Sequence, residues 1–174
     1  HSDTGSQVVV LGKPIGHMRV LEYFQKKTEL WSTVTEAYDA LAAKHDIIVL
    51  EGAGSPGEIN LKSHDLVNMR MADYARASVL LVGDIDRGGL YASFLGTWMT
   101  FTDAERRLLT GYLVNRFRGD ASLLGPAHQY LLDHTGVPVL GTVPYIRDLN
   151  IPEEDMAGFP WGQNADCGPK EPGT

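Results

Sequence analysis

The chain has 174 residues, of which 43% are hydrophobic and 21% are charged, the composition of a water-soluble globular protein. A chain of this length buries roughly two-thirds of the surface that it exposes when unfolded, so we expect one well-packed domain. The net charge of -7 argues against nucleic acid as a partner, because phosphate backbones are bound by net basic faces. No apolar run approaches the roughly 18 residues that a membrane-spanning helix needs, which argues against a membrane protein.

The first residues and the cysteine content together indicate a cytoplasmic protein. No basic segment leads into an apolar stretch with a small-residue cleavage site, as a secretory signal would. The single cysteine, Cys167, can form no internal disulfide and has no second cysteine for a metal knuckle. This fits a reducing compartment.

Short apolar segments rich in β-branched residues recur along the chain, at residues 7–11, 46–50, 78–83, 112–114 and 137–143. They are continuously apolar rather than alternating, which is typical of strands buried on both faces. We therefore expect a mainly parallel sheet with helices on both faces.

Helical patterns lie between these segments. One of them carries four large side chains on a single stripe: Trp31, Val34, Tyr38 and Leu41. Thr102 precedes Glu105 by three residues, a capping-box pattern that predicts the start of a short helix. Further helices are expected at residues 65–75, 90–101 and 122–134. Because strands and helices alternate, the predicted fold class is α/β.

A polar loop marked by glycine or proline follows each of the last four apolar segments. These loops read EGAGSPGE from Glu51, DIDRGG from Asp84, NRFRGD from Asn115 and PYIRDL from Pro144. The carboxyl ends of parallel strands lie along one crevice, and ligands bind in that crevice. We therefore expect the four loops to converge on one edge of the sheet.

The loop after residue 50 has the composition of a phosphate or metal site. Glu51 could bind Mg²⁺ directly or through water, and the small residues Gly52, Gly54 and Ser55 would let backbone N–H groups approach an anion closely. The alternative is a strand that ends in a glycine-rich turn, with the acid helping to cap the next element.

The next two loops carry further groups that could bind a ligand. In DIDRGG, Arg87 could hold a phosphate or carboxylate, although Asp84, Asp86 and Arg87 could equally form a local surface ion pair around a turn. Asn115 carries both a donor and an acceptor, which suits the edge of a purine. Asparagine is also a common turn residue.

Several familiar catalytic patterns do not occur in the sequence. The sequence GKP at Gly12 lacks the upstream glycine and the hydroxyl of a G-x-x-x-x-G-K-[ST] motif, so the usual triphosphate cradle is missing. The six histidines show no spacing typical of metal ligands. Cys167 lies in a Gly- and Pro-rich stretch, which makes it a poor candidate for a nucleophile.

Six stretches of the sequence together resemble the cobyric acid synthase family: SQVVVLGKPIGHM, YDALAAKHDIIVLEGAGSPGEINL, DLVNM, VLLVGDIDRGGLYASFLGT, GYLVNRFRGDASLL and TGVPVLGTVPYIRDLNIPEED. The resemblance runs from about Thr4 to Asp155. The combination of EGAGSP with DIDRGG and NRFRGD is far more specific than any one of these motifs.

The resemblance implies a P-loop-type ATPase domain, similar to dethiobiotin synthetase, that uses ATP and Mg²⁺. In this family corrin side-chain carboxylates are activated with ATP, and ammonia from a separate glutamine amidotransferase domain of the same protein forms the amides. The implied reaction converts adenosylcobyrinic acid a,c-diamide to cobyric acid in cobalamin biosynthesis, with a corrinoid carboxylate as the substrate.

The resemblance also implies roles for the loop residues. Glu51 falls on the family's Mg²⁺ carboxylate. The residues that would face the phosphates and the corrinoid acid are Gly52, Gly54, Ser55, Asp84, Asp86 and Arg87. The residues that would receive the adenine are Asn115 with its neighbour Arg116, and Pro144 and Tyr145 of the VPY stretch.

The chain also departs from the family pattern, because family members begin with a P-loop strand and helix and end with a glutaminase domain. We therefore expect an internal fragment, with a partial synthetase domain at residues 1–155, a Gly/Pro-rich tail or linker at 156–174, and no activity when isolated. The alternatives are a P-loop-like binding module without catalysis, or another carboxylate-activating ligase of the same ATPase group. Whether the protein forms a homodimer stays open.

Overall fold

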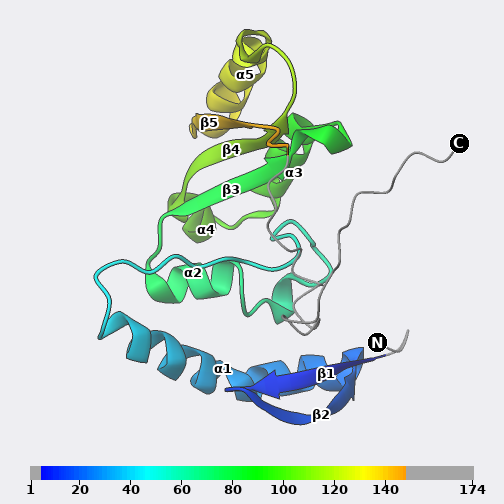
Figure 1. The fold of residues 1–174 in the computed structure, drawn as a ribbon, viewed down its shortest axis with the longest axis vertical. Coiled ribbons are helices and arrows are strands. Elements are labelled where there is room, and N and C mark those ends of the chain that lie inside the picture. Colours follow the sequence, from blue (N-terminus) through cyan, green and yellow to red (C-terminus); the bar gives the residue numbers. More distant parts are fainter. Residues whose placement is uncertain (1–4, 148–174) are drawn as a thin grey trace, which may run out of the picture.

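A computed structural model describes residues 5–147 of the chain, and the predicted tail at 156–174 lies outside this range. Within this range, five strands form two separate sheets (Figure 1). Strands β3 (Val79–Asp84), β4 (Leu109–Phe117) and β5 (Val139–Pro144) form a parallel sheet in that order. The predicted strands at 78–83, 112–114 and 137–143 are confirmed, and so is the α/β class.

The first predicted strand exists but belongs to a different sheet. Strand β1 (Gly5–Val10) pairs antiparallel with β2 (Lys13–Arg19) instead of joining the parallel sheet. The two residues between them, Leu11 and Gly12, have φ values of 49° and 77°. Two consecutive positive φ angles match the twist of a tight hairpin, so this turn returns the chain on itself. The predicted inclusion of 7–11 in the parallel sheet is therefore wrong.

The predicted strand at 46–50 is also wrong. The chain leaves helix α1 (Val20–Ala42), which carries the predicted stripe, and residues 46–50 then run without regular structure. The side chain of Val49 is 89% exposed. An apolar run becomes a strand only where a neighbouring strand bonds to its backbone, and within residues 5–147 the only hydrogen-bonded neighbour of β3 is β4.

The core lies between one face of the parallel sheet and helices α3 (Leu90–Thr100) and α5 (Gly125–Thr135). Tyr112 and Val114 of β4 and Leu131 of α5 are fully buried. The centre of the Phe94 ring in α3 lies 4.9 Å from the centre of the Tyr112 ring. The packing is closest at Gly83, where a Cβ atom would lie 2.1 Å from Leu90 and 2.8 Å from Phe94.

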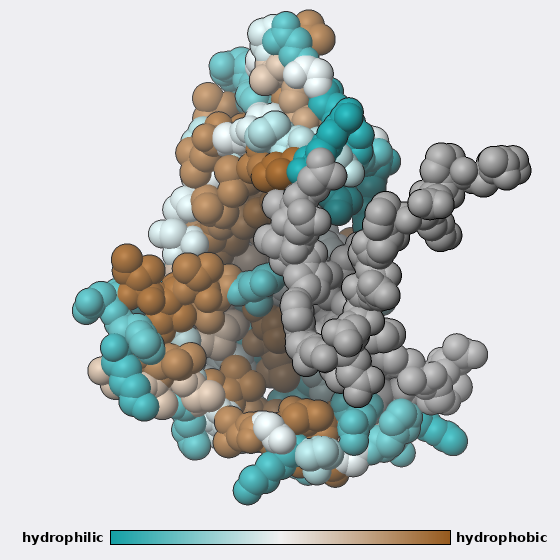
Figure 2. Space-filling model, in the orientation of Figure 1, coloured by the Kyte–Doolittle hydropathy of each residue, from teal (hydrophilic) through white to brown (hydrophobic). Residues whose placement is uncertain are grey.

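The opposite face of the parallel sheet is open in the described part of the chain. Leu80 and Val82 of β3 and Leu140 of β5 are exposed apolar residues. Leu80 and Leu140 both approach the position where Gly111 would carry a side chain, so they lie on the same face. Figure 2 shows apolar residues gathered over this sheet. Helical cover is therefore described on one face only.

Five shorter elements complete the described part of the chain. Two lie between α1 and β3, namely η1 (Lys62–His64) and α2 (Met69–Ala75). The other three lie between the strands of the parallel sheet, namely η2 (Ile85–Arg87), α4 (Asp103–Leu108) and η3 (Ala121–Leu124). The predicted helix at 65–75 begins only at Met69, because the Asp65 carboxylate accepts hydrogen bonds from the N–H groups of Val67, Asn68 and Arg70. None of the helices in residues 5–147 is long and apolar enough to cross a membrane.

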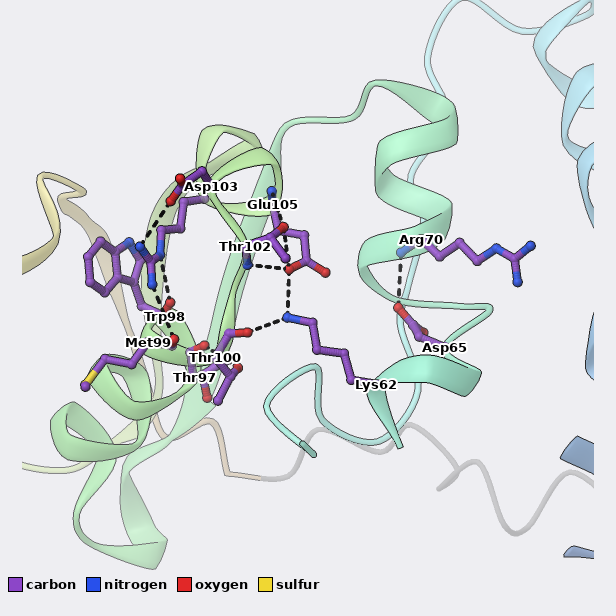
Figure 3. A network of polar contacts seen from close by, with 11 residues as sticks. Lys62, Asp65, Arg70, Thr97, Trp98, Met99, Thr100, Thr102, Asp103 and Glu105 are labelled. Carbon is purple, nitrogen blue, oxygen red and sulfur yellow. Dashed lines mark hydrogen bonds and ion pairs between the residues drawn. The ribbon is translucent and has the colours of Figure 1, made fainter. Parts of the chain in front are cut away.

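Lys62 joins η1 to the elements beside the sheet (Figure 3). Its Nζ atom lies 2.7 Å from Oε2 of Glu105 and also donates to the carbonyl oxygen of Thr100, at the end of α3. The same Glu105 oxygen accepts from the Thr102 N–H at 2.7 Å, which confirms the predicted capping box. The Glu105 side chain is only 17% exposed, so Lys62 neutralises a largely buried carboxylate.

We predict that Gly83→Ala destabilises the chain by about 1–3 kcal/mol, because the added methyl group must displace Leu90 or the buried ring of Phe94. The matched control is Gly96→Ala in α3, where a Cβ atom meets nothing within 4 Å. Alanine in a helix interior should raise stability there by about 0.5–1 kcal/mol. Unfolding in urea measures both changes, and equal effects would contradict the packing at Gly83.

We predict that Lys62→Met lowers the free energy of unfolding by about 1 kcal/mol, because it removes the cation paired with the Glu105 carboxylate and the donor to the Thr100 carbonyl. The control is Lys26→Met, which removes an exposed ion pair with Glu29 on α1. That change should cost less than about 0.5 kcal/mol. A Lys26 effect as large as that of Lys62 would contradict the role of Lys62.

The effect of Lys62→Met should also depend on pH. Burial by itself would raise the pKa of Glu105, but the bonds from Lys62 and Thr102 and the charge of Lys62 outweigh it and hold the pKa below its ordinary value of 4.5. A carboxylate with a lowered pKa contributes stability above its unfolded pKa and loses it as the pH falls through the folded value. The stability difference between parent and variant should therefore shrink below about pH 4.5.

Candidate functional site

Three of the four predicted loops meet at the carboxyl edge of the parallel sheet. Asp84 at the end of β3 is in register with Asn115 of β4, and Phe117 of β4 is in register with Pro144 of β5. The N–H of Tyr145 donates to the carbonyl oxygen of Phe117 at 2.8 Å. The sheet register alone therefore brings Asp84, Asn115 and Pro144 to one edge, as we expected.

Ion pairs connect the loops at this edge. Nη1 of Arg116 lies 3.2 Å from Oδ2 of Asp84, and Nη2 of Arg118 lies 3.2 Å from Oδ2 of Asp86. Nε of Arg87 is 4.0 Å from the same Asp84 oxygen, and its side chain is 86% exposed. Arg87 is thus the least engaged of the three guanidinium groups and the best placed to meet a ligand anion.

Asn115 and Arg116 have an unusual local geometry at the end of β4. Oδ1 of Asn115 accepts a hydrogen bond from the Arg116 N–H at 2.9 Å, and Arg116 has a left-handed φ of 60°. Such a conformation is uncommon outside glycine and concentrates at functional positions. Within residues 5–147 the Asn115 amide Nδ2 group has no hydrogen-bond partner, so it remains available to a ligand.

Arg118, which the sequence interpretation did not single out, also stacks on Tyr145. Its guanidinium carbon lies 3.5 Å from the centre of the Tyr145 ring, within the range of a cation–π contact. The hydrogen bond to Asp86, together with the charge of that carboxylate, raises the pKa of Arg118 above its ordinary value. The motif NRFRGD contained this residue, but its contacts with Asp86 and Tyr145 exist only in the folded chain.

The glycine-rich loop follows no strand of the parallel sheet. Its residues Gly54 and Ser55 line a cavity of about 140 Å³ together with Lys62 and Glu105. Asn68, from the DLVNM stretch, holds the loop by donating to the Ala53 carbonyl at 2.9 Å. A Cβ atom at Gly52 would lie 2.1 Å from Oδ1 of Asn68, so only glycine fits there without a shift.

Glu51 lies in the irregular segment before this cavity, not at the end of a strand of the parallel sheet. It is exposed, and no hydrogen bond or ion pair among residues 5–147 links it to Asp84 or Asn115. The predicted route of Glu51 to this edge, at the end of a strand of the parallel sheet, is therefore wrong, and its place at the edge stays a prediction. The reason is that residues 46–50, which were to place it there, do not pair with the sheet.

The described residues contain no group of three or more His, Cys, Asp or Glu side chains that could hold a metal ion. Mg²⁺ is commonly held by one or two carboxylates together with substrate phosphates and water. Asp84 and Asp86 already bond to arginines. The exposed carboxylate of Glu51 fits such a shared site better, as a single protein ligand.

Comparison with known proteins places this arrangement in context. Residues 21–153 match a family described as an AAA domain (AAA_26). The chain is 55% identical to a cobyric acid synthase of Nitratidesulfovibrio vulgaris over 91% of its own length, which is 29% of that protein. It is 52% identical to the cobyric acid synthase of Carboxydothermus hydrogenoformans, over 91% of this chain and 32% of that protein.

A further relative is the adenosylcobalamin biosynthesis bifunctional protein CobDQ of Leptospira interrogans, which is 48% identical over 92% of this chain and 19% of its own length. The chain thus spans about a third or less of these curated relatives. No solved structure matches it. The resemblance to cobyric acid synthases expected from the sequence is confirmed.

The family match covers more than half of the chain and agrees with the parallel sheet and helices described above. It confirms the predicted P-loop-type α/β class, for which nucleotide binding is the common property. The chain therefore belongs to the AAA domain family AAA_26.

Proposed function

We propose that this chain is part of a cobyric acid synthase and contributes the region that uses ATP to activate corrin side-chain carboxylates. The observation that carries the proposal is the identity of 48–55% to cobyric acid synthases and a cobalamin biosynthesis protein over about nine-tenths of the chain. The substrate would be adenosylcobyrinic acid a,c-diamide and the product cobyric acid. From the cysteine content we expect it to act in the cytoplasm.

The proposed chemistry makes an unreactive carboxylate able to form an amide. A carboxylate is a poor electrophile, so transfer of the γ-phosphoryl group of ATP to its oxygen creates an acyl phosphate and ADP. Ammonia then attacks the carbonyl carbon, the amide forms, and inorganic phosphate leaves with the C–O bond electrons. We propose that a glutamine amidotransferase region of the same protein supplies the ammonia.

The glycine-rich loop suits the phosphate end of the nucleotide. Glu51 would hold Mg²⁺, which when bound offsets the negative charge that gathers on the transferring phosphoryl group. Gly52, Gly54 and Ser55 carry no side chain or a short one, so their backbone N–H groups can approach phosphate oxygens. The position of Gly54 and Ser55 on the wall of a cavity supports this assignment.

The edge of the sheet suits the other groups of the reactants. The amide of Asn115, the backbone next to it at Arg116, and the Pro144–Tyr145 pair lie side by side and would receive the adenine. Asp84 and Asp86 would orient the guanidinium groups, and the exposed Arg87 would meet a phosphate or the corrinoid carboxylate.

We further propose that the chain by itself does not turn over ATP. Its sequence contains no G-x-x-x-x-G-K-[ST] motif, and in P-loop enzymes the backbone and lysine of this motif cradle the β- and γ-phosphates. The electrostatic contribution of that cradle is among the largest in phosphoryl transfer. The experiments below therefore use the full-length synthase.

In the full-length synthase, Glu51→Gln should reduce Mg²⁺-dependent ATP turnover by at least a hundredfold, because the change keeps the shape of the side chain and removes its charge. The measurement is phosphate release in the presence of glutamine and the corrinoid diamide. The control is Glu36→Gln, an exposed acid on α1. Turnover within twofold of the parent in Glu51→Gln would show that this carboxylate is no metal ligand.

Asn115→Ala should weaken ATP binding about tenfold or more and leave the already weaker binding of GTP nearly unchanged, because the loss falls on recognition of the base. Calorimetry with both nucleotides measures the ratio of their dissociation constants. Gln129→Ala, which removes a surface amide bonded to Asp133, is the control. Equal loss of ATP and GTP would exclude base recognition by Asn115.

A further inference from the structure

Arg118 joins three loops that are far apart in the sequence. It follows β4, its Nη2 atom lies 3.2 Å from Asp86 in the loop after β3, and its guanidinium carbon lies 3.5 Å from the centre of the Tyr145 ring after β5. One planar group therefore contacts both the loop after β3 and the residue after β5. A planar guanidinium can donate in its plane and stack through its face at the same time, which a lysine ammonium cannot do.

The two residues that Arg118 contacts, Asp86 and Tyr145, are each held by a hydrogen bond from their own backbone N–H group. The Asp86 N–H donates to Oδ1 of Asp84 at 3.0 Å, so the loop after β3 is tied to the end of its own strand. The Tyr145 N–H donates to the Phe117 carbonyl at 2.8 Å, one residue before Arg118. The backbone bond therefore fixes the position of the Tyr145 main chain, and the contact with Arg118 fixes the orientation of its ring.

The three arginines at this edge differ in their ion pairs. Arg116 neutralises Asp84, Arg118 neutralises Asp86, and Arg87 remains largely exposed at 4.0 Å from its nearest carboxylate oxygen. Three guanidinium groups face two carboxylates, and the surplus positive charge belongs to Arg87. Arg118 already contacts a carboxylate and an aromatic ring. It is therefore better suited to orient these groups than to bind a ligand anion.

We propose that Arg118 is a positioning residue that orients the Tyr145 ring to receive the purine base of the nucleotide. The inference rests on the proposed function, because it takes the base site at Asn115 and Tyr145 as its starting point. An aromatic ring that is oriented before the ligand arrives spares the ordering of that ring on binding. The stack and the exposed ion pair each amount to a severalfold effect, so together they should change affinity about tenfold.

The test compares nucleotide with a ligand that has no base, in the full-length synthase. Arg118→Gln should raise KM for ATP about tenfold and leave kcat and the inhibition constant of tripolyphosphate within twofold of the parent. Arg118→Lys keeps the charge but not the plane, so it should resemble Arg118→Gln. The control is Arg107→Gln, which changes an exposed arginine on α4.

A double-mutant cycle identifies the partner through which Arg118 acts. In a Tyr145→Leu background, Arg118→Gln should raise KM for ATP by less than twofold, because the ring to be oriented is gone. Equal losses of ATP and tripolyphosphate, additive effects of the two changes, or full rescue by lysine would each overturn the proposal.

The same data separate this inference from the proposed function. If Asn115→Ala weakens ATP and Arg118→Gln does not, the base site stands and the role of Arg118 is wrong. If the parent enzyme binds ATP and tripolyphosphate equally well, the base site is wrong and the role of Arg118 falls with it.

Discussion

The parallel hydrogen-bonded ladder of β3, β4 and β5 is the constraint on which the other features depend. Because Asp84 is opposite Asn115 and Phe117 is opposite Pro144, the ladder decides which loop residues can meet. It also presents Tyr112 and Val114 to α3 and α5, whose packing fixes the sheet. A one-residue slip of β4 would turn these core side chains to the other face and break the loop contacts at the same time.

Much of this sheet could be predicted from the sequence, because continuous apolar runs and the polar loops after them are local signals. The failures have a common physical cause. The runs at 7–11 and 46–50 look like the others, yet one pairs within a hairpin and the other with nothing described. Only the hairpin had a local signal, a glycine at position 12 directly after the apolar run.

The candidate site, like the sheet, could be predicted only in part from the sequence. Asp84 and Asn115 follow from the strand-end rule, whereas Glu51 depended on a strand that did not form. Arg118, Lys62 and Asn68 could not be identified in this way, because each acts on residues 15 to 43 positions away through contacts that only the folded chain creates. Long side chains with distant partners leave no spacing pattern in a sequence.

The face of the parallel sheet that no described helix covers affects how the chain behaves in solution. Leu80, Val82 and Leu140 attract apolar surfaces at short range, while the net charge of -7 repels other copies at long range. Salt shortens the reach of that repulsion from about 30 Å at 0.01 M to about 10 Å at 0.1 M and leaves the apolar attraction in place. Solutions of this chain should therefore stay clear at low ionic strength and become turbid as salt is added.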